Sequence, residues 1–330
     1  MNNMSKKIKW GILGCGRIAY KFAEGLKVLH DAILEAVASR TEGKAEIFGK
    51  TFGVQNIYKN YEELVNNPTM DVIYIATTHN FHYDNALLCL NHGKPVLCEK
   101  PFTLNAIQAE GLIKTAHNNN LFLMEAMWTR FLPCIVKLNE LLEKGILGEI
   151  QHFKADFGIK QKLDPKGRSF NPDLGGGALL DLGIYPISFA RMIYKQSPSE
   201  IKSNAYIGET GVDEKSCYLF EYENGQTAML SSSNRLVMPH DAFIFGTKGY
   251  LEIPDFYHPS KMILNLEGKR KKTIKMPFKS TGYNYEAKEV MNCLIDGKLE
   301  SEIMPLDETL GIMKTMDILR SQWHFKYPGE

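Results

Sequence analysis

The sequence predicts an α/β domain built on a doubly wound parallel sheet, followed by an α+β domain with a large open antiparallel sheet. Residues 8–125 alternate short apolar runs with segments of helical periodicity, as expected for strands joined by crossover helices. After Glu125 the pattern changes to pairs of strands around glycine-containing turns. A length of 330 residues is also enough for two domains with separate cores.

In the first domain, each predicted strand is a short apolar run bounded by a turn or a polar loop. These runs are Ile8–Leu13, Ile33–Ala38, Val72–Ala76, Pro95–Cys98 and Leu121–Glu125. The predicted helices carry apolar residues three and four positions apart and cover Arg17–Leu29, Lys44–Phe52, Tyr61–Asn66, Tyr83–Asn91 and Asn105–Asn118. Because helices alternate with strands, we expect parallel strands with right-handed connections.

In the second domain, the clearest signal is Asn224-Gly225, which is typical of a two-residue hairpin turn. The expected strands are Phe153–Phe157, Ser216–Tyr222, Gln226–Ser232, Ala242–Gly246, Tyr250–Ile253, Met262–Leu266 and Thr273–Met276, and the expected helices are Pro133–Lys144, Tyr285–Ile295 and Leu306–Ser321. We place the domain boundary between residues 125 and 126 and allow for the last helix packing back on the first domain.

The composition excludes several classes of protein. A hydrophobic content of 44% and a net charge of +1 give no general attraction to nucleic acid or to an acidic membrane. No apolar stretch is long enough to span a membrane and the N-terminus lacks the apolar run of a signal peptide, so we expect a cytoplasmic protein. The six cysteines show no Cys-x-x-Cys spacing, and we expect neither disulfides nor a bound metal.

The turn after the first strand reads Gly14-x-Gly16-x-x-Ala19, the G-x-G-x-x-A form of the dinucleotide fingerprint of Rossmann domains. Gly14 permits a tight turn, Gly16 lets the backbone approach a pyrophosphate, and Ala19 lets the helix pack closely on the strand. The free N–H groups at the helix start, around Arg17 and Ile18, favour an anion. Glycines that only shape a turn are the alternative. The strand before them and the helix after them favour NAD(P) binding.

The end of the second strand reads Ala38-Ser39-Arg40-Thr41 and indicates which cofactor binds. NAD-binding domains usually have an acidic residue there for the ribose 2′-hydroxyl. Arg40 instead can form charge-assisted bonds to a 2′-phosphate, and Ser39 can add another. We therefore expect NADP, with NAD as a possible second cofactor. An ordinary exposed arginine after a strand is the alternative.

The loop after the third strand and the end of the fourth strand are expected to line the cofactor crevice, since ligands bind outside the carboxyl ends of parallel strands. The loop places Thr77, His79 and His82 beside the cofactor. The two histidines are candidates for acid/base chemistry or for hydrogen bonding that positions other groups. They have no carboxylate or cysteine beside them that would favour metal binding.

Lys100 follows the fourth strand within Glu99-Lys100-Pro101. The proline disfavours a helical conformation for Lys100 and holds it extended. An ammonium group there can stabilise the oxygen of a substrate hydroxyl or carbonyl during hydride transfer. The alternative is a surface lysine at the end of a strand.

Gly175-Gly176-Gly177 precedes a helical segment that contains Asp181 and Tyr185. Residues four apart share a helix face, and Pro186 lacks the N–H for a regular turn, which predicts a kink or a π-type irregularity. Tyr185 can pass a proton to a substrate oxygen, with Lys100 lowering its pKa, and Asp181 can orient Lys100 or bind substrate. From the spacing alone, a structural aspartate and a core tyrosine are equally consistent.

These motifs together resemble the Gfo/Idh/MocA oxidoreductases. Within that family the likeness is to the group that holds the dimeric dihydrodiol dehydrogenases and the NADP-dependent D-xylose 1-dehydrogenases. Further segments that carry it are Met124–Phe131, Arg168–Gly177 and Tyr283–Glu286, and the likeness runs over nearly the whole chain.

The resemblance implies NADP-dependent oxidation of a sugar C1 hydroxyl or a cyclic trans-diol. It assigns catalysis to Lys100 and Tyr185, with Asp181 assisting, and Glu99 to the cofactor loop. Many members carry histidine at the position of Tyr185, whereas tyrosine is the form in the dihydrodiol and glucose–fructose enzymes. Trp128 and Arg130 lie in the first of the matching segments, and we expect both to contact the substrate. Trp128 and Phe157 match aromatic positions that line the substrate site; a core role for these two rings is an equal alternative. Family members commonly dimerise through the open sheet, so we expect a homodimer or a higher homo-oligomer.

Two other function classes stay open. A regulator that senses NADP without turnover would keep Arg40 and the glycine turn but has no use for Lys100, Asp181 and Tyr185 together. A redox-neutral glycosidase with tightly bound NAD would use hydride transfer only transiently, and net reduction of added cofactor distinguishes it from a dehydrogenase.

Overall fold

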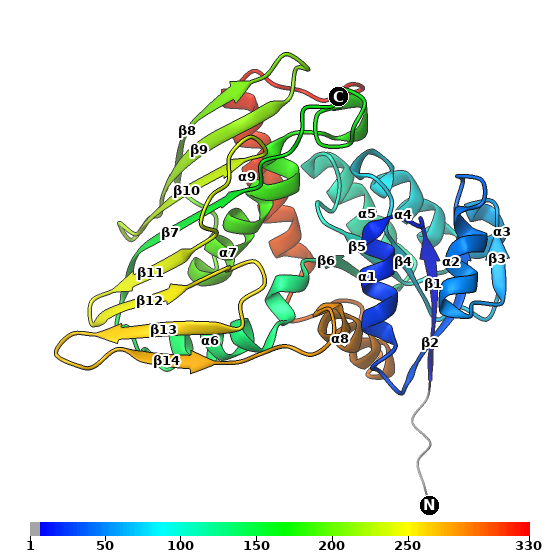
Figure 1. Ribbon diagram of the computed structural model, residues 1–330, viewed down its shortest axis with the longest axis horizontal. Helices are drawn as coiled ribbons and strands as arrows, with labels where there is room; N and C mark the ends of the chain where they lie inside the picture. Colours follow the sequence, from blue (N-terminus) through cyan, green and yellow to red (C-terminus); the bar gives the residue numbers. More distant parts are fainter. Residues whose placement is uncertain (1–6) are drawn as a thin grey trace, which may run out of the picture. The chain divides into compact units, whose positions relative to one another are not determined.

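The computed structural model describes residues 7–330, and the chain forms two compact units (Figure 1). Unit 1 contains the described residues up to Thr103 together with Ile107–Phe131 and Lys279–Thr309. Unit 2 contains Leu104–Ala106, Leu132–Phe278 and Leu310–Glu330. Each unit is thus assembled from separate stretches of the chain. The boundary at residue 125 stays a prediction of the sequence.

Unit 1 is built on a six-stranded sheet in the order β3-β2-β1-β4-β5-β6, and every pairing in it is parallel. The strands are β1 (Ile8–Leu13), β2 (Ala32–Ala38), β3 (Asn56–Tyr58), β4 (Val72–Ile75), β5 (Val96–Glu99) and β6 (Leu123–Ala126). The order reverses between β1 and β4, and such a reversal opens a crevice at the carboxyl ends of the strands. The predicted doubly wound sheet is confirmed.

The α-helices of unit 1 follow the predicted segments closely, whereas its two short 3-10 turns, η1 (His79–Phe81) and η2 (Trp128–Phe131), were not predicted. The α-helices are α1 (Arg17–Leu26), α2 (Lys44–Phe52), α3 (Tyr61–Val65), α4 (His82–Asn91), α5 (Ala106–Asn118) and α8 (Tyr283–Ile295). Apolar rings hold α1 on the sheet: Phe22 stacks on Tyr74 of β4 with centroids 3.8 Å apart and meets Trp10 of β1 edge-on at 5.2 Å.

α8 comes from far along the sequence and packs beside α1. Gly25 makes this contact possible, because a Cβ there would lie 2.9 Å from the backbone nitrogen of Asn284. The hydroxyl of Thr281 donates to the carbonyl of Lys21 at 2.8 Å. The helix that returns to unit 1 is thus α8, while the segment from Leu310 onward belongs to unit 2.

Unit 2 is built on an eight-stranded sheet in the order β14-β13-β12-β11-β7-β10-β9-β8. Its strands are β7 (Ile150–Gly158), β8 (Glu200–Ile207), β9 (Asp213–Glu221), β10 (Thr227–Ser233), β11 (Ala242–Gly246), β12 (Gly249–Ile253), β13 (Lys261–Leu266) and β14 (Lys272–Lys275). The sheet is mostly antiparallel as predicted, but β7 and β10 pair in parallel. Turn signals identify hairpins between neighbouring strands only, so they do not reveal this long-range pairing.

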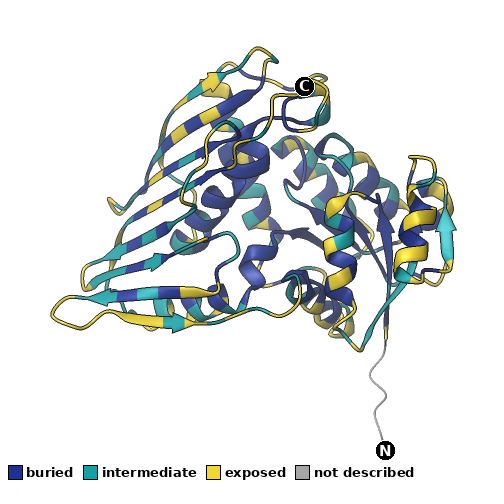
Figure 2. Ribbon diagram, viewed as in Figure 1, coloured by how far each residue is buried: buried dark blue, intermediate teal, exposed yellow. Residues whose placement is uncertain are grey.

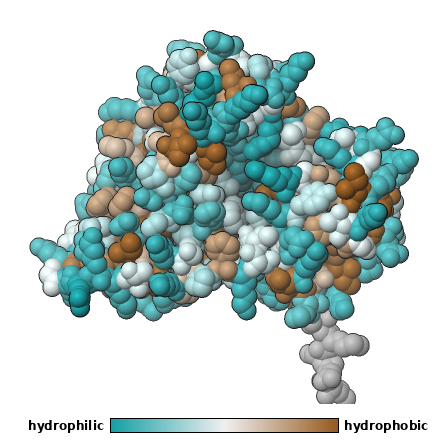
Figure 3. Space-filling model, viewed as in Figure 1, coloured by the Kyte–Doolittle hydropathy of each residue, from teal (hydrophilic) through white to brown (hydrophobic). Residues whose placement is uncertain are grey.

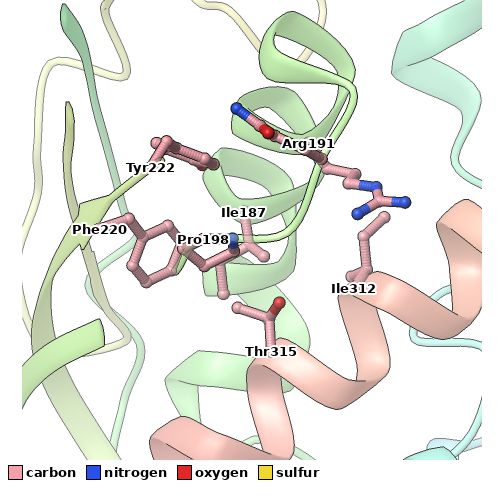
Figure 4. A pocket seen from close by; sticks show the side chains of 8 residues that line it. Ile187, Arg191, Pro198, Phe220, Tyr222, Ile312 and Thr315 are labelled. Carbon is pink, nitrogen blue, oxygen red and sulfur yellow. The ribbon is translucent and has the colours of Figure 1, made fainter. Parts of the chain in front are cut away.

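The sheet of unit 2 has one covered and one open face. Burial alternates along β8, where every second residue is exposed, and the same alternation is visible on β9 (Figure 2). The helical elements of this unit are α6 (Pro133–Glu143), η3 (Pro172–Leu174), η4 (Leu179–Gly183), α7 (Ile184–Tyr194) and most of α9 (Leu306–Gln322). α7 packs against β7 and β10. It forms with β9 and α9 a small cavity beneath Arg191 and Tyr222 (Figure 4).

Within residues 7–330, no helix is both long enough and apolar enough to cross a membrane. On the face drawn in Figure 3, hydrophobic residues form small separate patches among hydrophilic ones.

Candidate active site

The turn between β1 and α1 has the geometry that the fingerprint predicts. Gly14 has φ +93°, and a Cβ there would lie 2.8 Å from the carbonyl oxygen of Ala76. Gly16 is exposed at the N-cap of α1, and no side chain caps this helix start and no acidic residue lies in its first turn. Arg17 is exposed, Ile18 is half-buried and Ala19 is fully buried against the sheet. The uncapped N–H groups next to exposed backbone fit a pyrophosphate.

Arg40 lies at the carboxyl end of β2, next to this turn in the sheet order. Its guanidinium stacks over the ring of Phe81 at 4.2 Å and over the ring of Tyr61 at 5.1 Å, while the residue as a whole stays exposed. Ser39 is buried, and its hydroxyl accepts a bond from the backbone N–H of Thr41 at 3.2 Å. The two rings hold the cation in place for an anion that approaches from solvent.

His82 connects the loop after β4 with the loop after β5. The residue is fully buried; its Nδ1 donates to the carbonyl of Pro101 at 2.7 Å, and its Nε2 lies 3.2 Å from the carbonyl of Thr77. Burial is the main cause that lowers the pKa of His82 to about 4. It is therefore neutral near pH 7 and serves better as a clamp than as an acid. His79 is also buried, with its ring 5.8 Å from that of His82.

Glu99 is the last residue of β5, and Lys100 follows it, next to the carbonyl of Pro101 that His82 contacts. Glu99 is buried and accepts a hydrogen bond from the hydroxyl of Tyr74, and its other oxygen lies 3.3 Å from the backbone nitrogen of Lys100. Lys100 is half-buried, and the peptide bond between it and Pro101 is cis. The Glu99 carboxylate thus contacts Tyr74 with one oxygen and the backbone N–H of Lys100 with the other, which fixes the backbone from which the Lys100 side chain extends.

Trp128 and Arg130 lie on η2 in unit 1. The ring of Trp128 stacks on Tyr283 at 4.7 Å and is almost fully buried. Arg130 is buried and forms an ion pair with Glu308, with the carbonyl of Ile303 at 3.4 Å. A guanidinium held by a protein carboxylate serves the fold of this unit, so direct contact between Arg130 and a substrate stays a prediction.

Asp181 lies in unit 2 on η4, which is a π-helical turn, and the predicted irregularity is therefore confirmed. Its carboxylate forms a two-pronged ion pair with Arg168, at 3.0 Å and 3.3 Å. Asp181 is buried, whereas the side chain of Arg168 keeps 46% of its surface exposed. The sequence motif contained Arg168, but the pairing crosses a loop and could not be read from spacing.

Tyr185 follows on α7 and lies in a cluster of rings. The ring of Phe157 meets Tyr185 edge-on at 5.2 Å and stacks on Tyr257 at 4.5 Å, and the ring of His240 lies 4.9 Å from Phe157. Tyr185 is 8% exposed and Tyr257 is half-buried. We call Asp181, Arg168, Tyr185, Phe157, Tyr257 and His240 the Tyr185 cluster. Tyr257 and His240 were missed by the sequence reasoning because they follow no motif.

The structure thus collects the predicted residues into two groups, each within one unit. Unit 1 brings the glycine turn, Arg40, the loop of His79 and His82, and Lys100 to the carboxyl edge of one parallel sheet. Unit 2 holds the Tyr185 cluster. No group of three His, Cys, Asp or Glu side chains in the part of the chain that the structure describes is arranged to hold a metal ion.

A glycine-rich turn at the switch point of a parallel sheet, with a cation after β2 and another after β5, defines a Rossmann-type dinucleotide enzyme. Residues 8–127 match the oxidoreductase family described as having an NAD-binding Rossmann fold, and residues 135–252 match the GFO/IDH/MocA C-terminal domain. The chain belongs to the Gfo/Idh/MocA family of oxidoreductases.

The chain is similar to characterised relatives over its whole length. It is 38% identical to trans-1,2-dihydrobenzene-1,2-diol dehydrogenase of Xenopus tropicalis, over 97% of this chain and 99% of the relative. It is 34% identical to the D-xylose 1-dehydrogenase (NADP(+)) of Hypocrea jecorina, over 97% of this chain and 93% of the relative. These relatives confirm the family and the group that the motifs indicated.

Two solved structures share the fold. The aldose-aldose oxidoreductase of Caulobacter crescentus, complexed with glycerol, superposes with a TM-score of 0.88 at 23% identity over 96% of this chain and 97% of that one. A 3-ketoreductase of Actinomadura kijaniata in complex with NADP and TDP-benzene gives 0.86 at 24% identity over 96% of this chain and 98% of that one. At such identities the likeness supports the architecture.

Proposed function

We propose that the protein is an NADP-dependent oxidoreductase that transfers hydride between the cofactor and the C1 hydroxyl of an aldose or a hydroxyl of a cyclic trans-diol. The observation that carries the proposal is the placement of Arg40 and Lys100 at the carboxyl edge of the same sheet, either side of the glycine turn. Arg40 suits a 2′-phosphate and Lys100 suits a reacting oxygen. The named activities of the diol and xylose dehydrogenases support this substrate class.

The residues of unit 1 fit NADP. Gly14 allows a tight turn because it has no Cβ, which would clash with the carbonyl of Ala76. The uncapped start of α1 offers its N–H groups to the pyrophosphate. Arg40 supplies the charge-assisted contact to the 2′-phosphate. We assign Thr77, His79, His82 and Glu99 to the walls that position the cofactor. When bound, NADP supplies the hydride acceptor or donor.

The proposed mechanism divides the remaining chemistry between the two units. Lys100 stabilises the negative charge that develops on the substrate oxygen, and Tyr185 exchanges the hydroxyl proton. Asp181 assists, oriented by Arg168. We assign Phe157 and Trp128 to the wall behind the substrate, since both rings are buried and stacked, Phe157 on Tyr257 and Trp128 on Tyr283. We further propose a cytoplasmic homodimer that needs no metal.

The test measures the near-ultraviolet absorbance of reduced cofactor with purified protein, NADP or NAD, and a panel of aldoses, inositols and cyclic diols. We expect reduction of NADP with one substrate class. Arg40→Ala should weaken NADP binding at least tenfold and leave NAD binding unchanged, because a charge-assisted bond contributes about 1.5–3 kcal/mol. Bound NADP without reduction by any substrate would favour a sensor or a redox-neutral enzyme.

The catalytic assignment is tested by Lys100→Met. Turnover should fall by roughly two orders of magnitude or more while NADP binding is largely kept, since a positioned charge acts mainly on the transition state. Lys50→Met, at an exposed lysine of α2, is the matched control and should change neither quantity. Unchanged turnover in Lys100→Met would refute the assignment.

A further inference from the structure

Asp213 is a fully buried carboxylate at the start of β9 that no motif indicated. Its Oδ2 accepts a hydrogen bond from the backbone N–H of Leu179 at 2.7 Å. Leu179 is the first residue of the π-helical turn, which carries Asp181 two residues later. Asp213 therefore contacts the element that positions the Tyr185 cluster without being part of it.

The π-helical turn that begins at Leu179 has no local side-chain cap, because its N-cap residue is Ala178. The residue before it is Gly177, with φ +119°. A Cβ at that position would lie 2.3 Å from Oδ1 of Asp213, so the glycine leaves the space that the carboxylate occupies. From β9, Asp213 thus accepts the N–H of Leu179, which a local cap would otherwise accept.

The segment before the helix is fixed as well. The hydroxyl of Tyr327 donates to the carbonyl of Gly176 at 2.7 Å, and the backbone N–H of Gly177 donates to the carbonyl of Ser169 at 3.0 Å. With both sides of Gly177 held, the bond from Asp213 sets where the π-helical turn starts. Leu179 opens the turn that carries Asp181, and Tyr185 follows this turn on α7.

We propose that Asp213 is a positioning residue for hydride transfer, which holds the start of the π-helical turn so that Asp181 and Tyr185 face the substrate. This inference rests on the proposed function, since it assigns Asp213 an effect on that reaction. Asp213 is not a catalytic residue, because it acts only through the backbone of Leu179.

The titration of Asp213 gives the proposal a distinctive signature. Burial raises its pKa to about 7, while the backbone N–H groups of Leu179 and Ala178 lower it in part. The charged and titratable groups that face it are Arg320 of α9, Tyr327 of the C-terminal segment and Tyr218 of β9 itself. An ionised carboxylate accepts more strongly than a neutral one. The hydrogen bond from the Leu179 N–H to Asp213 therefore becomes stronger as the pH rises through about 7.

The contribution of Asp213 to the free energy of unfolding changes in the opposite direction, and decreases as the pH rises. A carboxyl whose pKa is raised in the folded state contributes stability that is complete below its ordinary range and is lost as the pH rises through the folded pKa. On its own, Asp213 should thus lower the wild-type melting temperature between the ordinary carboxyl range and about pH 7, and raise kcat around pH 7, where the folded carboxyl ionises.

The experiment compares the wild type with Asp213→Asn, which keeps the shape and one acceptor oxygen but cannot ionise. We expect kcat to fall at least tenfold and its inflection near pH 7 to disappear, with NADP affinity unchanged, because the cofactor residues lie in unit 1. Amide hydrogen exchange of the peptide that spans residues 176–183 should be faster. Asp173→Asn, at an exposed aspartate of η3, is the matched control and should behave like the wild type.

The outcomes separate the two proposals. An active wild type with an equally active Asp213→Asn variant and the same pH profile would overturn the role of Asp213, even if the variant melts earlier. A wild type that reduces NADP with no substrate would instead overturn the proposed function, and the exchange data would then report only the cap. If Asp213→Asn does not fold, amide exchange of the peptide that spans residues 176–183 in the wild type, corrected for the intrinsic exchange rate, decides the question. Protection that rises together with kcat through about pH 7 supports the proposal, and protection that stays unchanged refutes it.

Discussion

Glu286 is a buried carboxyl group on α8 whose two side-chain oxygens have no hydrogen-bond partner among the described residues. Burial raises its pKa well above the usual range, and the nearby Glu99 raises it further. Both carboxyls also raise the pKa of Tyr74, which places the three groups close together. The folded state therefore holds a proton that the unfolded chain releases. The stability from this proton is complete below the ordinary carboxyl range and is lost as the pH rises toward the folded pKa.

Glu286→Gln should remove this dependence because an amide cannot ionise. We expect the variant to match the wild type near about pH 4 and to be more stable by roughly 1–3 kcal/mol at about pH 8, the cost of a poorly compensated buried group. Urea unfolding at both pH values measures this. Glu223→Gln, at an exposed residue between β9 and β10, is the control and should leave the dependence unchanged. An unaltered pH dependence in Glu286→Gln would show that Glu286 ionises without cost.

At the residue scale, the sequence predicted the groups that follow a local pattern and missed those that depend on distant partners. The glycine turn and Arg40 were found because a strand end fixes where they lie. The ion pair of Arg168 with Asp181 joins residues 13 apart, and the bond of Asp213 to Leu179 joins residues 34 apart. Residues this far apart in sequence are not neighbours within one helix or one strand, so only the tertiary fold brings these groups together.

At the scale of elements, the π-helical turn was predictable and two strands were not. Pro186 has no N–H, which rules out a regular hydrogen bond at that turn, and the structure has the irregularity just before it. β3 has three residues and β8 carries polar residues on its exposed side, so neither has a strong apolar signature. Both lie at the edge of a sheet, where fewer apolar side chains are needed.

The two glycines of the β1–α1 turn should respond differently to alanine. Gly14→Ala must adopt φ +93° against the carbonyl of Ala76, so we expect a loss of roughly 1–3 kcal/mol in unfolding free energy as well as weaker NADP binding. At Gly16 the nearest atom to an added Cβ is 3.8 Å away. Gly16→Ala should leave stability within about 0.5 kcal/mol but reduce NADP affinity at least tenfold, because the methyl group occupies the approach of the pyrophosphate.

Denaturant unfolding and a fluorescence titration with NADP measure the two effects. Each variant serves as the control for the other, since both change one glycine of the same turn to alanine. Equal loss of stability in both would mean that the turn, and not its approach to the cofactor, requires glycine at Gly16.

At the scale of the whole molecule, one face of the unit 2 sheet is open. Ala228 and Leu230 of β10 point to the covered face and are buried, whereas Met229 between them is 53% exposed. A groove on the open face is lined by residues of four neighbouring strands, β7, β10, β9 and β8. Polar residues such as Lys154 and Asp156 line this groove together with the exposed Met229. The family resemblance implies that a second copy of this chain covers it.

Met229→Asp tests that expectation, because it places a charge at the middle of the groove without touching the covered core. We expect the wild type to sediment with twice the mass of one chain at micromolar concentration and the variant with the mass of a single chain, since desolvating an unpaired carboxylate costs several kcal/mol. Ile47→Asp, at an equally accessible apolar residue on α2 that is 62% exposed, should remain dimeric. A dimer that survives Met229→Asp would place the interface elsewhere on the molecule. A monomeric wild type would remove the need for any cover and leave the exposed methionine as an ordinary surface residue.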